Sequence, residues 1–276
     1  MPTVTSADGT AIAYERTGSG PVVVLVGTAL DDHHGLDLIA GLLADRCTLV
    51  NYDRRGRGES GDTQPYAPAR EVEDIAALLD ALGEPATLAS GSGGCLLALD
   101  AATALGDRVA GLFLYEPPLI VGPGRPVPAD YREHVEGLLR EDRRSEVVEY
   151  FFTQVVGVPA EYIGPMQADP SWQTMCRYAH TLPYDAQIAA GTQDGKPLPT
   201  DRWSTSRPVE VVVGENSPEF FHEGARALVD LLPQATLRVL PGQDHGAFWA
   251  APEVLADMIV DAVAVARHCA RGTAAG

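Results

Sequence analysis

Cysteine is scarce in this sequence of 276 residues, and the four that occur, Cys47, Cys95, Cys176 and Cys269, are scattered along it. They form no C-x-x-C pair and no other spacing typical of a zinc site or a disulfide framework. We therefore expect reduced thiols, as in a cytoplasmic protein, with no metal and no cofactor.

Basic residues are also few. The 20 Lys and Arg residues stand against 38 Asp and Glu, so the formal net charge is −18. Binding to nucleic acid or to anionic lipid depends on clustered positive charge, and this composition argues against both. No apolar run approaches the roughly 18 residues of a membrane span, and residues 1–20 lack the pattern of a signal peptide. The expected partner is a small-molecule substrate. The sequence does not determine the oligomeric state, and a homodimer is possible.

Apolar runs of β-branched residues alternate with helical patterns. Residues 22–27, 48–52, 86–89, 109–115, 209–213 and 237–240 are expected to form strands. Residues 36–44, 68–83, 95–104, 219–232 and 252–268 have helical character, and 10–16 resemble a hairpin strand. Continuous apolar strands between helices are typical of a doubly wound, mostly parallel α/β sheet. In such sheets ligands bind at the carboxyl ends of the strands.

Residues 119–206 interrupt this alternation with several helical segments, expected near 129–141, 144–156 and 170–190. We interpret them as a helical cap inserted after the sixth strand. The predicted organisation is therefore one α/β core, formed by residues 1–118 and 207–276, with a cap at 119–206.

The first candidate catalytic residue is Ser92, in the segment Ser90-Gly91-Ser92-Gly93-Gly94 between a predicted strand and an apolar helix. A nucleophile on such a sharp turn needs small neighbours. A phosphate-binding loop would need a Lys after the glycines, where Cys95 stands instead.

The second candidate is His245, which follows the last predicted strand in Gly242-Gln243-Asp244-His245. Its imidazole suits a general base for the serine hydroxyl.

These motifs together resemble the α/β-hydrolase superfamily, as do the segment Asp53-Arg54-Arg55-Gly56-Arg57-Gly58-Glu59-Ser60 and the segment Tyr115-Glu116-Pro117-Pro118. The resemblance runs from about Val22 to Val263, except through the cap. It implies an oxyanion hole made by the amides of Gly93 and Thr28, although Val26 stands where the family usually has His.

The resemblance does not fix which carboxylate completes a triad with Ser92 and His245. In most members this acid follows the strand that precedes the histidine loop, a position that Ser217 occupies here. Some members carry the acid after the sixth strand instead, where Glu116 stands. Glu116 is the preferred candidate. Glu215, Glu219 or a Ser–His dyad remain alternatives.

Aromatic residues of the cap have two interpretations, packing or pocket lining. Trp172, Tyr178 and Phe152, with Trp249 beside the histidine, are expected to bind substrate. The run Asp31-Asp32-His33-His34 could bind a metal, but a solvated loop is the default interpretation.

The predicted function is a serine hydrolase that acts on an ester, a lactone or a similar carbonyl of a small organic substrate. The alternative is a non-hydrolytic enzyme of the same fold, such as a cyclase, lyase or cofactor-free oxygenase of secondary-metabolite biosynthesis. A non-catalytic binding protein is a third hypothesis.

Overall fold

A computed structural model describes residues 1–273 of the chain, with the side chains of residues 1–270. An eight-stranded sheet runs through the molecule in the order β1-β2-β4-β3-β5-β6-β7-β8. The strands are β1 (Thr3–Thr5), β2 (Ala11–Gly18), β3 (Val22–Val26), β4 (Thr48–Tyr52), β5 (Ala86–Gly91), β6 (Val109–Tyr115), β7 (Val209–Gly214) and β8 (Ala235–Leu240). Along this spatial order, the strand pairs from β4 to β8 are parallel. The two pairs at the other edge, β1–β2 and β2–β4, are antiparallel. The predicted mostly parallel α/β sheet is confirmed.

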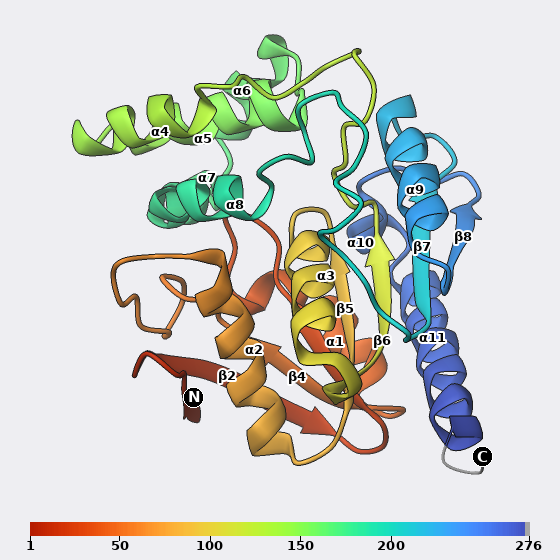
Figure 1. The fold of residues 1–276 in the computed structure, drawn as a ribbon. Coiled ribbons are helices and arrows are strands. Elements are labelled where there is room, and N and C mark those ends of the chain that lie inside the picture. The colour runs from red at the N-terminus through yellow and green to blue at the C-terminus, as the bar shows by residue number, and fades with distance from the viewer. Residues whose placement is uncertain (274–276) are drawn as a thin grey trace.

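Helices cover both faces of this sheet (Figure 1). On one face lie α2 (Pro68–Leu82), α3 (Gly94–Leu105) and α9 (Glu219–Leu231), whose buried residues share a core with the strands. On the other lie α1 (Asp37–Leu43), α10 (Ala247–Ala250) and α11 (Pro252–Thr273). Parallel strands covered on both faces are mostly apolar, and β3 and β4 are buried along their whole length. The two polar residues of β4, Thr48 and Asn51, donate side-chain hydrogen bonds to backbone carbonyls.

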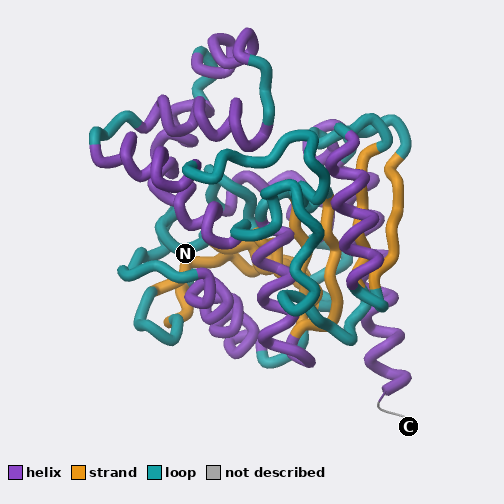
Figure 2. The backbone as a smooth tube through the Cα atoms, turned by 45° about the horizontal axis from the view of Figure 1, so that its top comes forward, coloured by secondary structure: helices purple, strands orange, loops and turns teal. Residues whose placement is uncertain are grey.

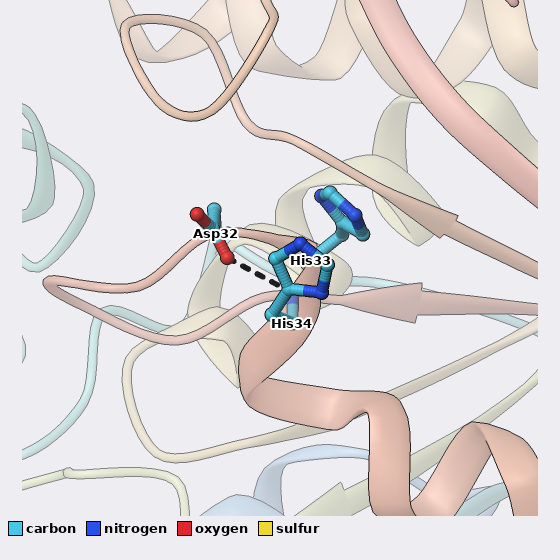
Figure 3. Close-up of side chains that lie close together, drawn as sticks. All are labelled: Asp32, His33 and His34. Carbon is cyan, nitrogen blue, oxygen red and sulfur yellow. Dashed lines mark hydrogen bonds between the residues drawn. The ribbon is translucent and has the colours of Figure 1, made fainter. Parts of the chain in front are cut away.

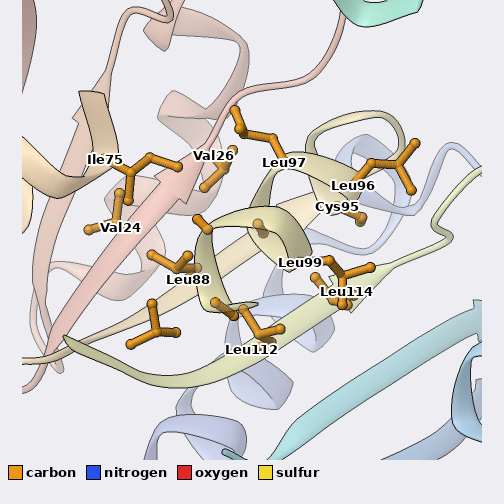
Figure 4. Packing of buried hydrophobic residues seen from close by; sticks show 14 of the residues in the cluster. Val24, Val26, Ile75, Leu88, Cys95, Leu96, Leu97, Leu99, Leu112 and Leu114 are labelled. Carbon is orange, nitrogen blue, oxygen red and sulfur yellow. The ribbon is translucent and has the colours of Figure 1, made fainter. Parts of the chain in front are cut away.

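Helix α3 packs at the centre of the first core layer. Figure 4 shows Leu96, Leu97 and Leu99 among side chains of β3, β5 and β6 such as Val24 and Leu112. Because most residues of α3 are apolar and buried, the helix is held between the sheet and its neighbouring helices rather than on the surface. This packing fixes the position of the turn that precedes the helix.

The chain between β6 and β7 forms a mostly helical insertion that lies beyond the carboxyl ends of the strands (Figures 1 and 2). It contains α4 (Tyr131–Arg140), α5 (Arg144–Tyr150), a π-helical turn (Phe151–Val156), α6 (Ala160–Gln167), α7 (Ser171–Tyr178) and α8 (Leu182–Ile188). Short 3-10 turns occur at His33–Leu36, Gly106–Arg108 and Ala179–Thr181. Among residues 1–273, none of the helices combines the length and the apolar character needed to cross a bilayer.

Candidate active site

Ser92 lies on the turn between β5 and α3. Its φ of 49° is in the left-handed region that L-residues rarely adopt, and its amide donates a hydrogen bond to the Tyr115 carbonyl, 2.9 Å away. A Cβ at Gly94 would lie 2.7 Å from the Gly27 carbonyl oxygen, so a larger residue would collide with backbone. The strained turn therefore depends on its small neighbours, and such strain is typical of functional positions.

Glu116 follows β6 directly and is completely buried, also with a positive φ, of 52°. Its Oε2 lies 2.7 Å from Nδ1 of His245, which comes from the loop after β8. This hydrogen bond places a proton on Nδ1 and leaves Nε2 of the imidazole to accept one.

The second carboxylate oxygen of Glu116 accepts two further hydrogen bonds. The Gly214 amide lies 2.7 Å from Oε1, and the Ser217 hydroxyl donates to the same oxygen. A buried carboxylate without donors would be strongly destabilising, so these contacts fix both the position and the orientation of the acid. Ser217, at the position where the resemblance puts the acid, thus contacts the acid that follows β6.

The alternative acids are engaged elsewhere. Glu215 accepts a hydrogen bond from the Gly242 amide at 2.8 Å, and Glu219 forms an exposed ion pair with Arg226. Of the three carboxylates considered, Glu116 is the one that contacts His245.

The His245 ring is further held by an aromatic contact. It stacks on Phe221 of α9, with the ring centroids 4.8 Å apart and an angle of 18° between the planes. The hydroxyl of Tyr115 also donates to the Asp244 carbonyl, which ties the histidine loop to the end of β6. Contacts from two elements therefore orient the imidazole before any ligand binds.

Ser92, Gly93 and His245 line a common cavity of about 480 Å³. Part of its wall comes from the strand ends and part from the insertion. Most of the wall is apolar and includes Ala29, Leu96, Pro118, Ile120, Val127, Phe151, Val155, Val156, Leu182, Phe220 and Phe221. A cavity of this size and character fits a small organic molecule.

Comparison with known proteins decides the family. A family model described as "Alpha/beta hydrolase family" matches residues 18–258. The chain belongs to the alpha/beta hydrolase family. A crystal structure of an alpha/beta hydrolase from Sphaerobacter thermophilus is 44% identical, with a TM-score of 0.86, and the match covers 94% of this chain and 99% of that one.

Other similar proteins match this chain less closely or over a shorter stretch. A thermophilic esterase from Thermogutta terrifontis is 24% identical, with a TM-score of 0.63 and coverage of 94% and 96% of the two chains, a likeness that shows the fold alone. "Probable oxidoreductase EphD" of Mycobacterium tuberculosis is 40% identical over 89 residues, which are 30% of this chain and 15% of that protein. The chain therefore matches only a small part of that curated relative.

Of the two predicted oxyanion donors, Gly93 lines the cavity, and Thr28 directly precedes a lining residue. Within residues 1–273, neither the Gly93 amide nor the Thr28 amide donates a hydrogen bond to another residue. The Thr28 carbonyl accepts a hydrogen bond from Arg57, which fixes the loop after β3. Ala29, the residue after Thr28, is the member of this loop that lines the cavity.

Arg54, Arg55 and Arg57 each pair with at least one acidic side chain. Arg54 binds Glu71 through two hydrogen bonds of 2.6 and 2.8 Å. Burial acts to raise the pKa of Glu71, but the charge and hydrogen bonds of Arg54, together with smaller effects of Arg57 and Tyr66, hold that pKa below its ordinary value. Arg54 and Arg57 also reach Asp185 of α8, each at 2.8 Å. These pairs connect the insertion to the loop that precedes α2.

The four aromatic residues expected to bind substrate require a correction, because none of them belongs to the cavity wall formed by the described residues. Trp172 and Phe152 pack against each other inside the insertion, with ring centroids 6.1 Å apart. The Tyr178 hydroxyl donates to Asp32, and Trp249 is 70% exposed. Composition indicates aromatic helices, but not which helix face meets the cavity.

Other aromatic residues line the cavity instead, namely Tyr131, Phe151, Phe220 and Phe221. Phe220 and Phe221 open α9, directly after the segment that carries Ser217. The sequence could have indicated these two residues, because they follow a parallel strand, and the loops after parallel strands meet at the edge of the sheet where ligands bind.

Asp32, His33 and His34 lie close together (Figure 3). Their side chains are occupied by hydrogen bonds with protein groups. Nδ1 of His33 lies 2.7 Å from Asp53, and Nδ1 of His34 lies 2.7 Å from Asp37. Asp32 accepts from the His34 amide and from the Tyr178 hydroxyl. These contacts explain why the three side chains lie close together in this loop.

Proposed function

We propose that the protein is a serine hydrolase that cleaves an ester, lactone or similar carbonyl of a small organic substrate. The observation that supports it most directly is that His245, hydrogen-bonded to the buried Glu116, lines the same cavity as Ser92. Acyl transfer requires an activated serine and an oriented imidazole in one cavity, and both are present here.

In this mechanism His245 accepts the Ser92 proton through Nε2 as the hydroxyl oxygen attacks the carbonyl carbon. Glu116 stabilises the imidazolium that forms. The amides of Gly93 and Thr28 donate to the oxyanion of the tetrahedral intermediate, and Ala29 places the Thr28 loop against the cavity. His245 then protonates the leaving group, and in the second half it activates water to release the acid product from Ser92.

Labelling with a fluorophosphonate probe tests this proposal. The probe forms a covalent adduct only with an activated serine, so we expect a single adduct on the peptide that contains Ser92, located by mass spectrometry. Ser92→Ala should remove the adduct, while Ser171→Ala, at an exposed serine of α7, should keep it.

An adduct without turnover of any simple ester would favour the non-hydrolytic alternative. Labelling that persists in Ser92→Ala would contradict the assignment of the nucleophile.

A further inference from the structure

Gly91, the last residue of β5, directly precedes Ser92 and is in close contact with an aromatic ring. Its backbone does not adopt a positive φ, so its conformation does not by itself require glycine. A Cβ at this position would nevertheless lie 2.5 Å from Cε2 and 3.1 Å from Cζ of Phe248. Glycine is therefore needed here because the Phe248 ring packs directly on it.

The Phe248 ring also contacts Tyr115, the neighbour of Gly91 in the sheet. The two ring centroids lie 5.7 Å apart, with an angle of 82° between the planes, which is a favourable edge-to-face arrangement. Tyr115 pairs with Gly91 in the register of β5 and β6, and its carbonyl accepts the hydrogen bond of the Ser92 amide. Phe248 thus contacts the two residues that hold the backbone of the nucleophile turn.

Phe248 and His245 belong to one closely hydrogen-bonded turn. The Asp244 carbonyl accepts a hydrogen bond from the Ala247 amide at 3.1 Å, and the Asp244 carboxylate accepts one from the Gly246 amide at 2.8 Å. Phe248 follows at once, in α10. Because these bonds join the histidine loop to the start of the helix, a displacement of the Phe248 ring would move His245 with it.

The sheet alone does not join the loops that carry Ser92 and His245. Ser92 follows β5 and His245 follows β8, and these strands are separated by β6 and β7, so no backbone ladder connects the two loops directly. We propose that Phe248 is a positioning residue of the catalytic pair, whose ring fixes the distance between the histidine loop and the nucleophile turn. Neither Phe248 nor Gly91 belongs to the cavity wall formed by residues 1–270, so the ring acts through His245 rather than on the substrate. This inference rests on the proposed function, which gives Ser92 and His245 their catalytic roles.

The kinetics of p-nitrophenyl butyrate hydrolysis test this positioning role. Phe248→Ala should lower kcat by about 10- to 100-fold, because misplacing a catalytic group by about 1 Å costs up to about 10²-fold in rate. The KM should stay within about twofold, since the ring does not line the cavity. Phe248→Leu, which keeps a large apolar side chain at this half-buried position, should lose less activity. Trp249→Ala is the matched control in the same helix; that side chain is 70% exposed, and its removal should leave kcat unchanged.

A second substitution distinguishes positioning from general destabilisation. In the wild-type protein, Gly91→Ala would place a Cβ against the Phe248 ring, so both kcat and the urea midpoint of unfolding should fall. In the Phe248→Ala background the ring is absent, so Gly91→Ala should lower neither quantity. A ring that contributed only to stability would change the urea midpoint and leave kcat per folded molecule unaltered.

Two results would overturn the proposal. One is a kcat of Phe248→Ala within about threefold of wild type after correction for the folded fraction. The other is an equal effect of Gly91→Ala in both backgrounds. Failure of the proposed function has a different signature: the wild-type protein would neither hydrolyse the ester nor react with the fluorophosphonate, which would end the positioning role as well, while the urea midpoints would still show that the effect of Gly91→Ala depends on Phe248.

Discussion

Replacing Glu116 by Gln tests the geometry of the site most directly. The substitution keeps the size of the side chain but removes the charge that His245 contacts at 2.7 Å. A hydrogen bond to a charged group contributes about 1.5–3 kcal/mol, which corresponds to roughly 10- to 150-fold in rate. An amide N–H facing Nδ1 would also favour the wrong imidazole tautomer, which costs up to about 10⁴-fold in a serine triad.

We therefore expect Glu116→Gln to lower kcat by about 10²- to 10⁴-fold with little change in KM, because the acid does not contact the bound substrate. The assay is hydrolysis of p-nitrophenyl butyrate, normalised by circular dichroism for the folded fraction. Glu219→Gln is the matched control, since this exposed carboxylate pairs with Arg226. Activity of Glu116→Gln within about threefold of wild type, or a large loss in Glu219→Gln, would refute the assignment of the acid.

The Ser217 hydroxyl offers a restoration experiment. It already contacts the carboxylate of Glu116, so an aspartate at position 217 would place a carboxylate close to the same point. We expect Glu116→Ala/Ser217→Asp to be about tenfold more active than Glu116→Ala, because one charge-assisted contact to His245 would be recovered. No recovery in a folded double variant would mean that the backbone after β6 is needed to orient the acid.

Three further predictions concern stability. Ser92→Gly should unfold with a free energy about 1 kcal/mol higher than Ser92→Ala in urea titrations, because glycine relieves the left-handed φ of 49°; equal values would show that the turn is unstrained. Asp185→Asn should lower the free energy of unfolding by about 3 kcal/mol, since it leaves two buried arginines without their shared partner. Asp194→Asn, at an exposed pair, should change it by less than about 0.5 kcal/mol. The hydrogen bond to Asp37 raises the pKa of His34, so the wild type should be more stable than His34→Gln at pH 5.5. This advantage should disappear as the pH rises through the folded-state pKa of His34. An advantage that grows above pH 8 would contradict the ion pair. Because His34 is exposed, the difference should stay below about 1 kcal/mol.

Local patterns in the sequence located most of the α/β core. The apolar β-branched runs predicted β3, β4, β6 and β7 to within a residue or so, because a strand covered on both faces is mostly apolar. Short elements escaped prediction. The strand β1 has only 3 residues, and α6 contains an internal proline, Pro165, so neither carries a clear periodicity.

The sequence alone determined that Ser92 stands on a strand-to-helix turn with small neighbours and that His245 follows the last strand, because both facts are properties of contiguous residues. It narrowed the acid to a few carboxylates. Only the tertiary structure decided that Glu116 contacts His245 while Ser217 contacts Glu116, since that choice depends on how the ends of β6 and β7 meet. The cavity wall was likewise decided in three dimensions. Trp172 packs inward and Tyr131 lines the cavity because helix packing, rather than aromatic content, determines which face of the insertion meets the strand ends.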